Sequence, residues 1–298
     1  MTDSEIEDLY RRIKPHIKKE STVPYARWSA KVSDTTITAY NSGKVLFQGN
    51  DLSWLEDESP AKSASGAKKA SKSASGLQDQ VPSAGSDEVG TGDYFGPLTV
   101  ASVLVETLEQ AEALKKMGIT DSKQLKDSFI RKAAPKIKEL VPFSVQVLDP
   151  IHYNSTWRKP DRNLNWIKTM MHNQAYLNLK AKGYNLPKLM VVDQFCVPSS
   201  FRKYVRDAKE IVEGLHFETK AESKYIAVAA ASVLARNAFL EYWDKMEEKY
   251  DFHFEKGGGA AVDACAARFV EEHGWQEMSS VAKMHFANTD KVKNKLKD

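Results

Sequence analysis

Hydrophobic residues recur at two different spacings along the chain, and these spacings predict two parts of different structure. Near the N-terminus, behind a Ser4-to-Glu7 capping pattern, four residues follow a helical period: Ile6, Leu9, Ile13 and Ile17. Pro15 is expected to kink or split this helix. Short segments rich in β-branched and aromatic residues then predict three strands, over 25–32, 35–40 and 44–48. The first part is therefore expected to be a small α+β module with an antiparallel meander.

From residue 83 onward, strand-like and helix-like segments are mixed. Buried strands are expected over 83–88, 98–105, 143–148 and 189–193. Helices are expected over 108–117, 126–140, 162–182, 199–208, 223–250 and 260–273. Pro135 is expected to interrupt the second of them. This order predicts a layered α/β domain, in which polar residues at strand ends are candidates for chemistry.

The composition changes between the two parts. From residue 60 to residue 80, alanine, serine and lysine alternate, and a near-repeat at 61–66 returns at 71–76. Such a stretch buries little apolar surface, so we expect a flexible, cationic linker that is either a solvated tether or grazes phosphates through its lysines. The expected domains are therefore residues 1–59 and 81–298, joined by the linker over 60–80.

Composition and charge exclude several classes of protein. No stretch approaches the roughly 18 apolar residues of a membrane span, and acidic residues crowd the N-terminus where a secretory signal needs basic ones, so a cytoplasmic protein is expected. The two cysteines form no C-x-x-C pair, and the seven histidines form no H-x-H or H-x-x-x-H pair. Any metal site should therefore consist of carboxylates. The net charge of +3 permits a nucleic-acid partner without demanding one.

The N-terminal module has a basic central stretch. Positions 9 to 44 contain eight lysine and arginine residues but only two acidic residues. This balance predicts nucleic-acid contact through Arg27, Lys31 and Lys44. The nearby aromatic residues either stack on nucleic acid or form the core of the sheet: Tyr25, Trp28, Tyr40 and Phe47.

Four acidic residues stand at the ends of predicted elements. Asp87 and Glu88 end one strand, Asp193 ends another, and Glu222 precedes the long apolar helix. Carboxylates at one sheet edge repel each other unless a divalent cation neutralises them, and a site without histidine or thiolate suits Mg²⁺ or Mn²⁺. The alternative is that Asp87 is a turn residue, Glu88 is solvated and Glu222 offsets a helix dipole.

A glycine-rich stretch follows the first acidic pair, from Gly90 to Gly96. It does not match the dinucleotide-binding fingerprint, because Phe95 stands where that pattern needs glycine. The chain also lacks the phosphate-binding G-x-x-x-x-G-K-[ST] pattern and the G-x-S-x-G pattern of serine hydrolases. These absences count against nucleotide-cofactor, ATPase and serine-hydrolase functions.

Several of these segments together resemble one family. They are the block from Gly85 to Pro97, Thr120-Asp-Ser-Lys-Gln-Leu125, Val191-Val-Asp193, Thr219-Lys-Ala-Glu-Ser223 with the following Ala229-Ala-Ala-Ser-Val233, and Ser42-Gly-Lys-Val-Leu-Phe-Gln-Gly49. They resemble bacterial ribonuclease HIII, a type 2 ribonuclease H. Glu222 and Gly90-Thr-Gly92 favour this family over its sister, ribonuclease HII, which generally has aspartate and Gly-Arg-Gly there.

The resemblance implies a ribonuclease H-like mixed-sheet catalytic domain preceded by a TATA-box-binding-protein-like domain. It also implies endonucleolytic cleavage of the RNA strand in RNA/DNA hybrids, with Mg²⁺ or Mn²⁺ held by Asp87, Glu88, Asp193 and Glu222. Asp87 is expected to bridge two ions, with Asp193 and Glu222 completing one each. Because adjacent strand residues face opposite sides, Glu88 can join Asp87 only if the strand loses its regularity there.

The substrate contacts follow the same motifs. The backbone of Gly90, Thr91 and Gly92 is expected to hydrogen-bond successive 2′-hydroxyl groups in the minor groove of the hybrid. Ser122 and Lys123 are expected to contact phosphate, whereas Lys220 and Lys224 either do so or are solvated. The alternatives are incision at single ribonucleotides in DNA, as by ribonuclease HII, and a non-catalytic nucleic-acid-binding protein.

A monomer is expected. Three further acidic residues are expected in turns or caps and not in the metal site: Asp93, Asp121 and Asp263. His285 has no assigned role.

Overall fold

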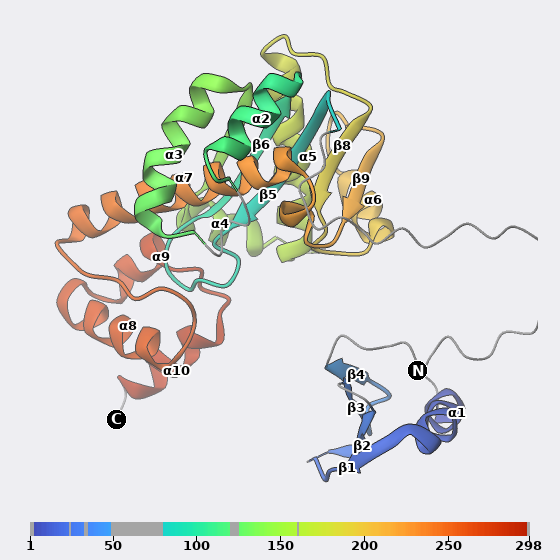
Figure 1. Ribbon diagram of the computed structural model, residues 1–298. Coiled ribbons are helices and arrows are strands. Elements are labelled where there is room, and N and C mark those ends of the chain that lie inside the picture. Colours follow the sequence, from blue (N-terminus) through green and yellow to red (C-terminus); the bar gives the residue numbers. More distant parts are fainter. Residues whose placement is uncertain are drawn as a thin grey trace, which may run out of the picture. The chain divides into compact units, whose positions relative to one another are not determined.

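The computed structural model describes residues 3–23, 25–32, 35–48, 80–119, 125–159 and 161–296. The chain forms two compact units, residues 1–72 and 73–298 (Figure 1). The division lies inside the segment expected to be a linker, of which only Gln80 is among the described residues. Within the described ranges, no helix combines the length and the apolar character that crossing a membrane requires.

The smaller unit is one helix and a four-stranded antiparallel sheet. Its elements are α1 (Asp3–Ile13), a 3₁₀ turn (Lys14–His16), β1 (Ile17–Glu20), β2 (Ala26–Val32), β3 (Thr35–Tyr40) and β4 (Val45–Gln48), in the sheet order β1-β2-β3-β4. Leu9 and Ile13 of α1 pack on Ala30, Val32 and Ile37 of the sheet. The expected break at Pro15 is confirmed, but the prediction that the helical pattern extends to Ile17 is wrong. Pro15 lies in the 3₁₀ turn, which ends the helix and lets Ile17 begin a fourth strand.

The larger unit is built on a five-stranded mixed sheet. Its strands are β5 (Ser83–Val89), β6 (Leu98–Val105), β7 (Phe143–Leu148), β8 (Leu189–Asp193) and β9 (Leu215–Glu218), in the order β7-β6-β5-β8-β9. The pairs β5–β6 and β6–β7 are antiparallel, and β5–β8 and β8–β9 are parallel. The predicted mixed sheet is therefore confirmed, with β9 as an additional strand.

Helices cover both faces of this sheet (Figure 1). They are α2 (Leu108–Lys116), α3 (Asp127–Leu140), α4 (Pro150–Trp157), α5 (Leu164–Ala181), α6 (Pro198–Val205), α7 (Ile226–Tyr250), α8 (Ala260–His273), α9 (Met278–Val281) and α10 (Ala287–Lys295). Of these helices, α4, α9 and α10 are not predicted from the sequence. The prediction that Pro135 interrupts α3 is also wrong, because α3 runs through it with Ile130 and Ile137 both buried against the core.

Gly85 sets the distance between the sheet and α7. A Cβ atom on Gly85 would lie 2.3 Å from the backbone nitrogen of Val228 and 2.6 Å from the carbonyl carbon of Ala227. The first turn of α7 therefore packs directly on the backbone of β5, which only glycine allows. On the opposite face of β5, Ser86 contacts His172 of α5. Residues 85 and 87 thus face α7, whereas residues 86 and 88 face α5.

Candidate active site

Asp87 and Asp193 end neighbouring parallel strands. The register of β5 and β8 pairs Ser86 with Val192, so the next residue of each strand is a candidate carboxylate at the same edge of the sheet. Asp87 is 5% exposed and accepts a hydrogen bond from Ser232 of α7. Asp193 is half-buried, and its Oδ1 atom accepts a hydrogen bond of 2.9 Å from the backbone of Ala221.

Glu222 reaches the same edge from a different element. It lies in the 3₁₀ turn Ala221–Ser223, immediately before α7, and is 3% exposed. Because the Ala221 backbone binds Asp193, this turn is fastened to the end of β8. The Glu222 and Asp193 carboxyl groups are hydrogen-bonding neighbours. The structure thus brings together Asp87, Asp193 and Glu222, as the sequence analysis expects.

The electrostatics of this group favour a cation. Burial raises the pKa of Asp87 well above its usual range, and repulsion from Glu88 and Asp193 raises it further. Burial, followed by the charges of Glu222 and Glu88, raises the pKa of Asp193 to about 6. No cationic side chain is among the described groups that shift these two pKa values. Oxygen donors with uncompensated negative charge fit a hard divalent cation such as Mg²⁺ or Mn²⁺.

Glu88 faces the other side of β5. The condition for Glu88 to join Asp87 is not met, because Asp87 and Glu88 pair in continuous register with Ala101 and Val100 of β6. The structure therefore does not bring Glu88 onto the face of β5 that carries Asp87, contrary to what the resemblance implies. Within the described part of the chain, no three histidine, cysteine, aspartate or glutamate side chains are already arranged to hold a metal ion.

A helix that the sequence analysis did not connect with the site supplies the partners of Glu88. Lys168 of α5 forms an ion pair with Glu88, and the Nε2 atom of His172 lies 2.9 Å from the Oε2 atom of Glu88. Burial would raise the pKa of Glu88, but His172 and Lys168 outweigh it and lower this pKa. His172 Nδ1 also lies 2.8 Å from the hydroxyl oxygen of Ser86, which fixes the orientation of the ring.

The aromatic ring of Phe195 completes this arrangement. The Lys168 Nζ atom lies 4.1 Å from the Phe195 ring centroid, and the His172 ring stacks on Phe195 at 5.2 Å. Lys168 and His172 are four residues apart and lie on one face of α5. That spacing within an otherwise apolar helix face is the signal from which these two residues could have been found.

The predicted RNA-reading loop follows β5 directly. Gly90 has φ of +98°, and a Cβ atom there would lie 2.2 Å from the carbonyl oxygen of Pro97, so glycine is required. Gly92 is exposed, and a Cβ atom there would have no neighbour within 4 Å. The chain at Gly92 therefore leaves room for a ligand, in the loop that directly follows the strand carrying Asp87.

The four side chains of the larger unit that are predicted to contact phosphate have different surroundings. Ser122 and Lys123 lie outside the described residues. Lys220 is exposed and has φ of +54°. Lys224 forms an ion pair with Glu218.

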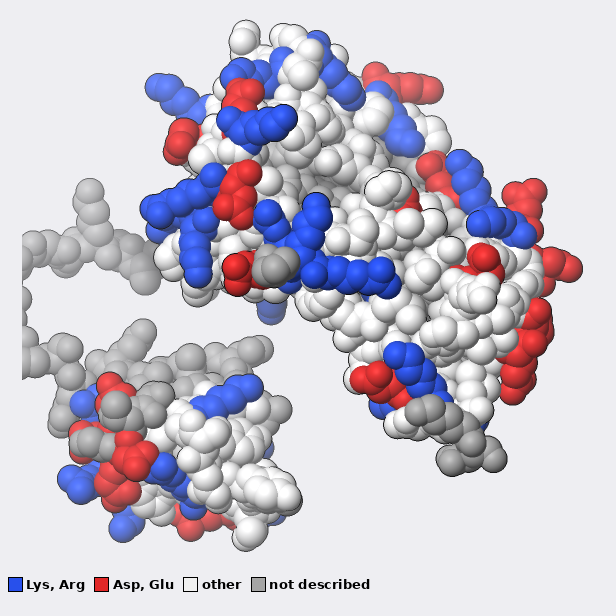
Figure 2. Space-filling model, turned by 180° about the vertical axis from the view of Figure 1, so that it is seen from behind, with Lys and Arg blue, Asp and Glu red and all other residues white. Residues whose placement is uncertain are grey.

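Figure 2 shows acidic side chains along one edge of this unit, while lysine and arginine side chains are spread over much of the rest of that face.

In the smaller unit, the predicted contacts fall on two sides of the sheet. Arg27 is bound by Asp3 of α1 at 2.7 Å, and Trp28 packs on Tyr10 of α1 with ring centroids 5.2 Å apart. Lys31 lies between the buried residues Ala30 and Val32, so it occupies the face turned away from α1. It stands directly opposite Lys19 in the β1–β2 register. Two facing lysines repel each other, which an anion bound between them would relieve. Lys44 is exposed in the turn before β4.

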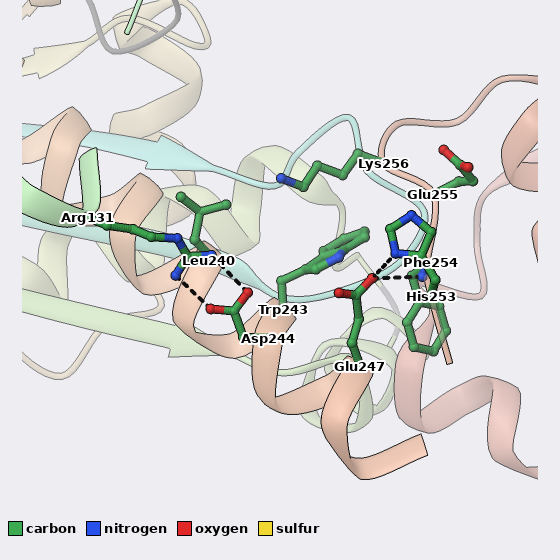
Figure 3. A pocket seen from close by; sticks show the side chains of 9 residues that line it. All are labelled: Arg131, Leu240, Trp243, Asp244, Glu247, His253, Phe254, Glu255 and Lys256. Atoms are coloured by element: carbon green, nitrogen blue, oxygen red, sulfur yellow. Dashed lines mark hydrogen bonds and ion pairs between the residues drawn. The ribbon is translucent and has the colours of Figure 1, made fainter. Parts of the chain in front are cut away.

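A separate cavity of about 350 Å³ lies between α7, α3 and the segment after α7 (Figure 3). It contains none of the four candidate carboxylates. Arg131 pairs with Asp244 at 2.6 Å, and the Nδ1 atom of His253 lies 2.9 Å from Glu247. Two of the three carboxylates that line this cavity therefore lie beside a basic side chain, unlike Asp87 and Asp193 at the end of β5.

Comparisons with known proteins agree with this geometry. A family model described as ribonuclease HII matches residues 84–289, and a domain of unknown function matches residues 1–72. The chain is 40% identical to ribonuclease HIII of Enterococcus faecalis, over 92% of this chain and 91% of the relative. It is 38% identical to ribonuclease HIII of Bacillus mycoides, over 98% and 96%. The structure is similar to the crystal structure of Bst-RNase HIII in complex with Mn²⁺, with a TM-score of 0.71, 35% identity and coverage of 100% and 98%.

Proposed function

The chain belongs to the ribonuclease HIII family, and on this basis we propose that it is an endonuclease that hydrolyses the RNA strand of RNA/DNA hybrids with Mg²⁺ or Mn²⁺. The observation that carries this proposal is the meeting of Asp87, Asp193 and Glu222 at one edge of the sheet, directly before the Gly90–Gly92 loop. The resemblance identified from the motifs is thus confirmed at the level of the family.

Asp87, Asp193 and Glu222 would hold the divalent ions, whereas Glu88 lies on the opposite face of β5 and acts on Asp87 and Asp193 through its charge. When bound, such ions supply the positive charge that activates water and stabilises the leaving oxygen in two-metal phosphodiester hydrolysis. Ser232 and the Ala221 backbone orient Asp87 and Asp193 by hydrogen bonds. Lys168 and His172 keep Glu88 ionised and directed toward α5.

The loop from Gly90 to Gly92 would select RNA. Since Gly92 is open to solvent and carries no side chain, its backbone can approach the wide, shallow minor groove of an A-like duplex and bind 2′-hydroxyl groups. Thr91 replaces the arginine of the sister family, so the loop has no cation that would clamp a single junction phosphate. Extended stretches of ribonucleotides are therefore the proposed substrate.

Matched duplexes test this function. A strand with several consecutive ribonucleotides, paired with DNA, should be cut at least about a hundredfold faster than the same strand with one ribonucleotide, because several adjacent sugars then contact the loop. Initial rates with Mg²⁺, and with EDTA as control, measure this ratio. Equal rates on both duplexes would favour the ribonuclease HII-like alternative, and metal-dependent binding without cleavage of either would leave a non-catalytic binding protein.

We also propose that the smaller unit holds the hybrid. Its support is the pair of facing lysines, Lys19 and Lys31, on the sheet face turned away from α1. A second, tethered contact raises the local concentration of substrate at the larger unit. Action as a monomer, and in the cytoplasm, stays a prediction.

Charge reversal on the sheet tests the holding role. The double variant Lys31→Glu and Lys44→Glu should raise KM for the hybrid by about tenfold, reduce its dependence on salt and leave kcat nearly unchanged, because phosphate contacts are lost and the catalytic residues are not. Arg12→Glu, an exposed change of the same sign on α1, is the matched control. A loss of kcat at saturating hybrid with unchanged KM would contradict the holding role. Arg27 is unsuitable for this test because Asp3 binds it.

A further inference from the structure

Lys283 is a buried lysine outside the site described so far. It is 1% exposed, and among the described residues it forms no ion pair. Its Nζ atom instead donates hydrogen bonds to two consecutive backbone carbonyls, those of Gly96 at 2.7 Å and Phe95 at 3.2 Å. These carbonyls belong to the segment that leads from the Gly90–Gly92 loop into β6.

The chain around Lys283 runs along this segment as a short antiparallel pair. The backbone of Lys283 donates to the carbonyl of Tyr94 at 2.8 Å, and the backbone of Gly96 donates to the carbonyl of Val281 at 2.8 Å. Phe95 and Ala282 form a β-bridge between these two hydrogen bonds. The lysine therefore adds side-chain hydrogen bonds to a backbone pairing that already fixes its position.

Asn154 of α4 forms hydrogen bonds with the backbone of residues 279–284, on the side opposite residues 94–96. The Nδ2 atom of Asn154 donates to the carbonyls of Ser279 at 3.1 Å and Ala282 at 2.9 Å, and its Oδ1 atom accepts from the backbone of Met284 at 2.9 Å. Asn154 is 6% exposed. Residues 279–284 thus form a rigid strip between α4 and the segment after the loop.

The position of this segment controls the loop itself. Gly90, where the loop begins, packs so closely on the carbonyl of Pro97, the last residue before β6, that a Cβ atom would lie 2.2 Å from it. Asp93 is fixed as well, since its Oδ1 atom accepts a hydrogen bond of 2.7 Å from the backbone of Gly257. A shift of residues 94–97 would consequently move Gly90 and the backbone of Thr91 and Gly92.

The amine of Lys283 is costly for folding. Burial lowers the pKa of Lys283 to about 7, although the charge of Asp93 opposes this shift. A methionine of similar length would fill the same space without the cost of burying an ammonium group. The amine instead orients the backbone, because it holds the carbonyl groups of Phe95 and Gly96 toward one point. Gly96 has φ of +75°.

We propose that Lys283 is a positioning residue that fixes the Gly90–Gly92 backbone for recognition of RNA. This inference rests on the proposed function, in which that backbone reads 2′-hydroxyl groups. Lys283 and Asn154 act through the loop: neither touches the substrate, and neither belongs to the carboxylate group.

Binding in EDTA by the full chain tests the inference without cleavage. The wild type should bind a short RNA/DNA hybrid more tightly than a DNA duplex of the same sequence. Lys283→Met should reduce this preference by about tenfold, the expected effect of losing hydrogen bonds from a buried charged donor, and a cooperative thermal transition shows that the variant is folded. Lys291→Met, at a lysine whose side chain is 58% exposed on α10, should keep both the preference and the Tm.

The outcomes separate the inference from the function on which it rests. A folded Lys283→Met that keeps the wild-type preference overturns the positioning role. Equal binding of both duplexes by the wild type overturns the recognition of 2′-hydroxyl groups, and the inference with it. If Lys283→Met does not fold, Asn154→Asp replaces it, because aspartate still accepts from Met284 but loses both donated hydrogen bonds. An unchanged preference in folded Asn154→Asp then contradicts the proposal.

Discussion

Asp87→Asn is expected to lower kcat on an RNA/DNA hybrid by about a thousandfold or more while leaving binding of the hybrid intact, since the amide cannot supply the negative charge that a divalent ion requires. Steady-state cleavage in saturating Mg²⁺ measures the loss, and fluorescence anisotropy in EDTA measures binding. Asp244→Asn is the matched control, because Asp244 pairs with Arg131 beside the cavity of Figure 3 and lies outside the carboxylate group. Near-normal turnover by Asp87→Asn would remove the proposed site.

The same variant should be more stable than the wild type when no metal is present. A carboxyl group whose pKa is raised by folding binds protons more tightly in the folded state. The folded protein therefore loses stability as the pH rises through the titration range of that group. For Asp193 this window runs from the usual value of 3.8 to about 6, and for Asp87 it extends further upward. In EDTA at pH 8, Asp87→Asn should therefore raise Tm, and Mg²⁺ should raise the wild-type Tm more than that of the variant. A lower Tm for the variant in EDTA would contradict the repulsion described for this site.

The meeting of Asp87 and Asp193 could be predicted because strand ends are visible in the sequence. The apolar runs before Asp87 and Asp193 indicate buried strands, and parallel neighbours present their carboxyl ends at one edge. Whether β5 stays regular at Glu88, and so whether Glu88 joins Asp87, could not be predicted. The sequence does not show that pairing with β6 continues to Val89 after pairing with β8 has stopped at Ser86.

The residues that surround the site come from distant segments, and this explains why they were missed. Lys168 and His172 are 80 or more positions from Glu88 along the chain, and only the packing of α5 on the sheet brings them together. Lys283 reaches the loop from the C-terminal region in the same way. Such contacts depend on tertiary structure, for which a single sequence has no local signal.

The missed strands have a local cause. β9 spans only Leu215–Glu218, and alternation over four residues gives too little pattern to separate a strand from a loop. In the smaller unit, Ile17 continues the helical spacing by coincidence, although the proline before it ends the helix. Pro15 predicts a break in the helix, but it does not predict that the chain after the break begins a strand.

Gly85→Ala is expected to destabilise the larger unit by about 1–3 kcal/mol and to reduce kcat by at least about tenfold. The added Cβ atom would lie 2.3 Å from the backbone nitrogen of Val228. A flexible side chain could move aside, but here the contact is the backbone of α7, so the whole helix must shift away from β5. That shift carries Ser232 and the preceding Glu222 turn away from Asp87, which explains why activity should fall together with stability.

Urea denaturation and cleavage at saturating hybrid measure the two effects of Gly85→Ala. Gly259→Ala, at the residue that precedes α8, is the matched control, because a Cβ atom there would have no neighbour within 4 Å and its φ is −85°. That control should stay within about 0.5 kcal/mol of the wild type and keep its kcat, as surface substitutions generally do. If Gly85→Ala also stays within this range and retains full kcat, the close approach of α7 to β5 does not set the geometry of the carboxylates.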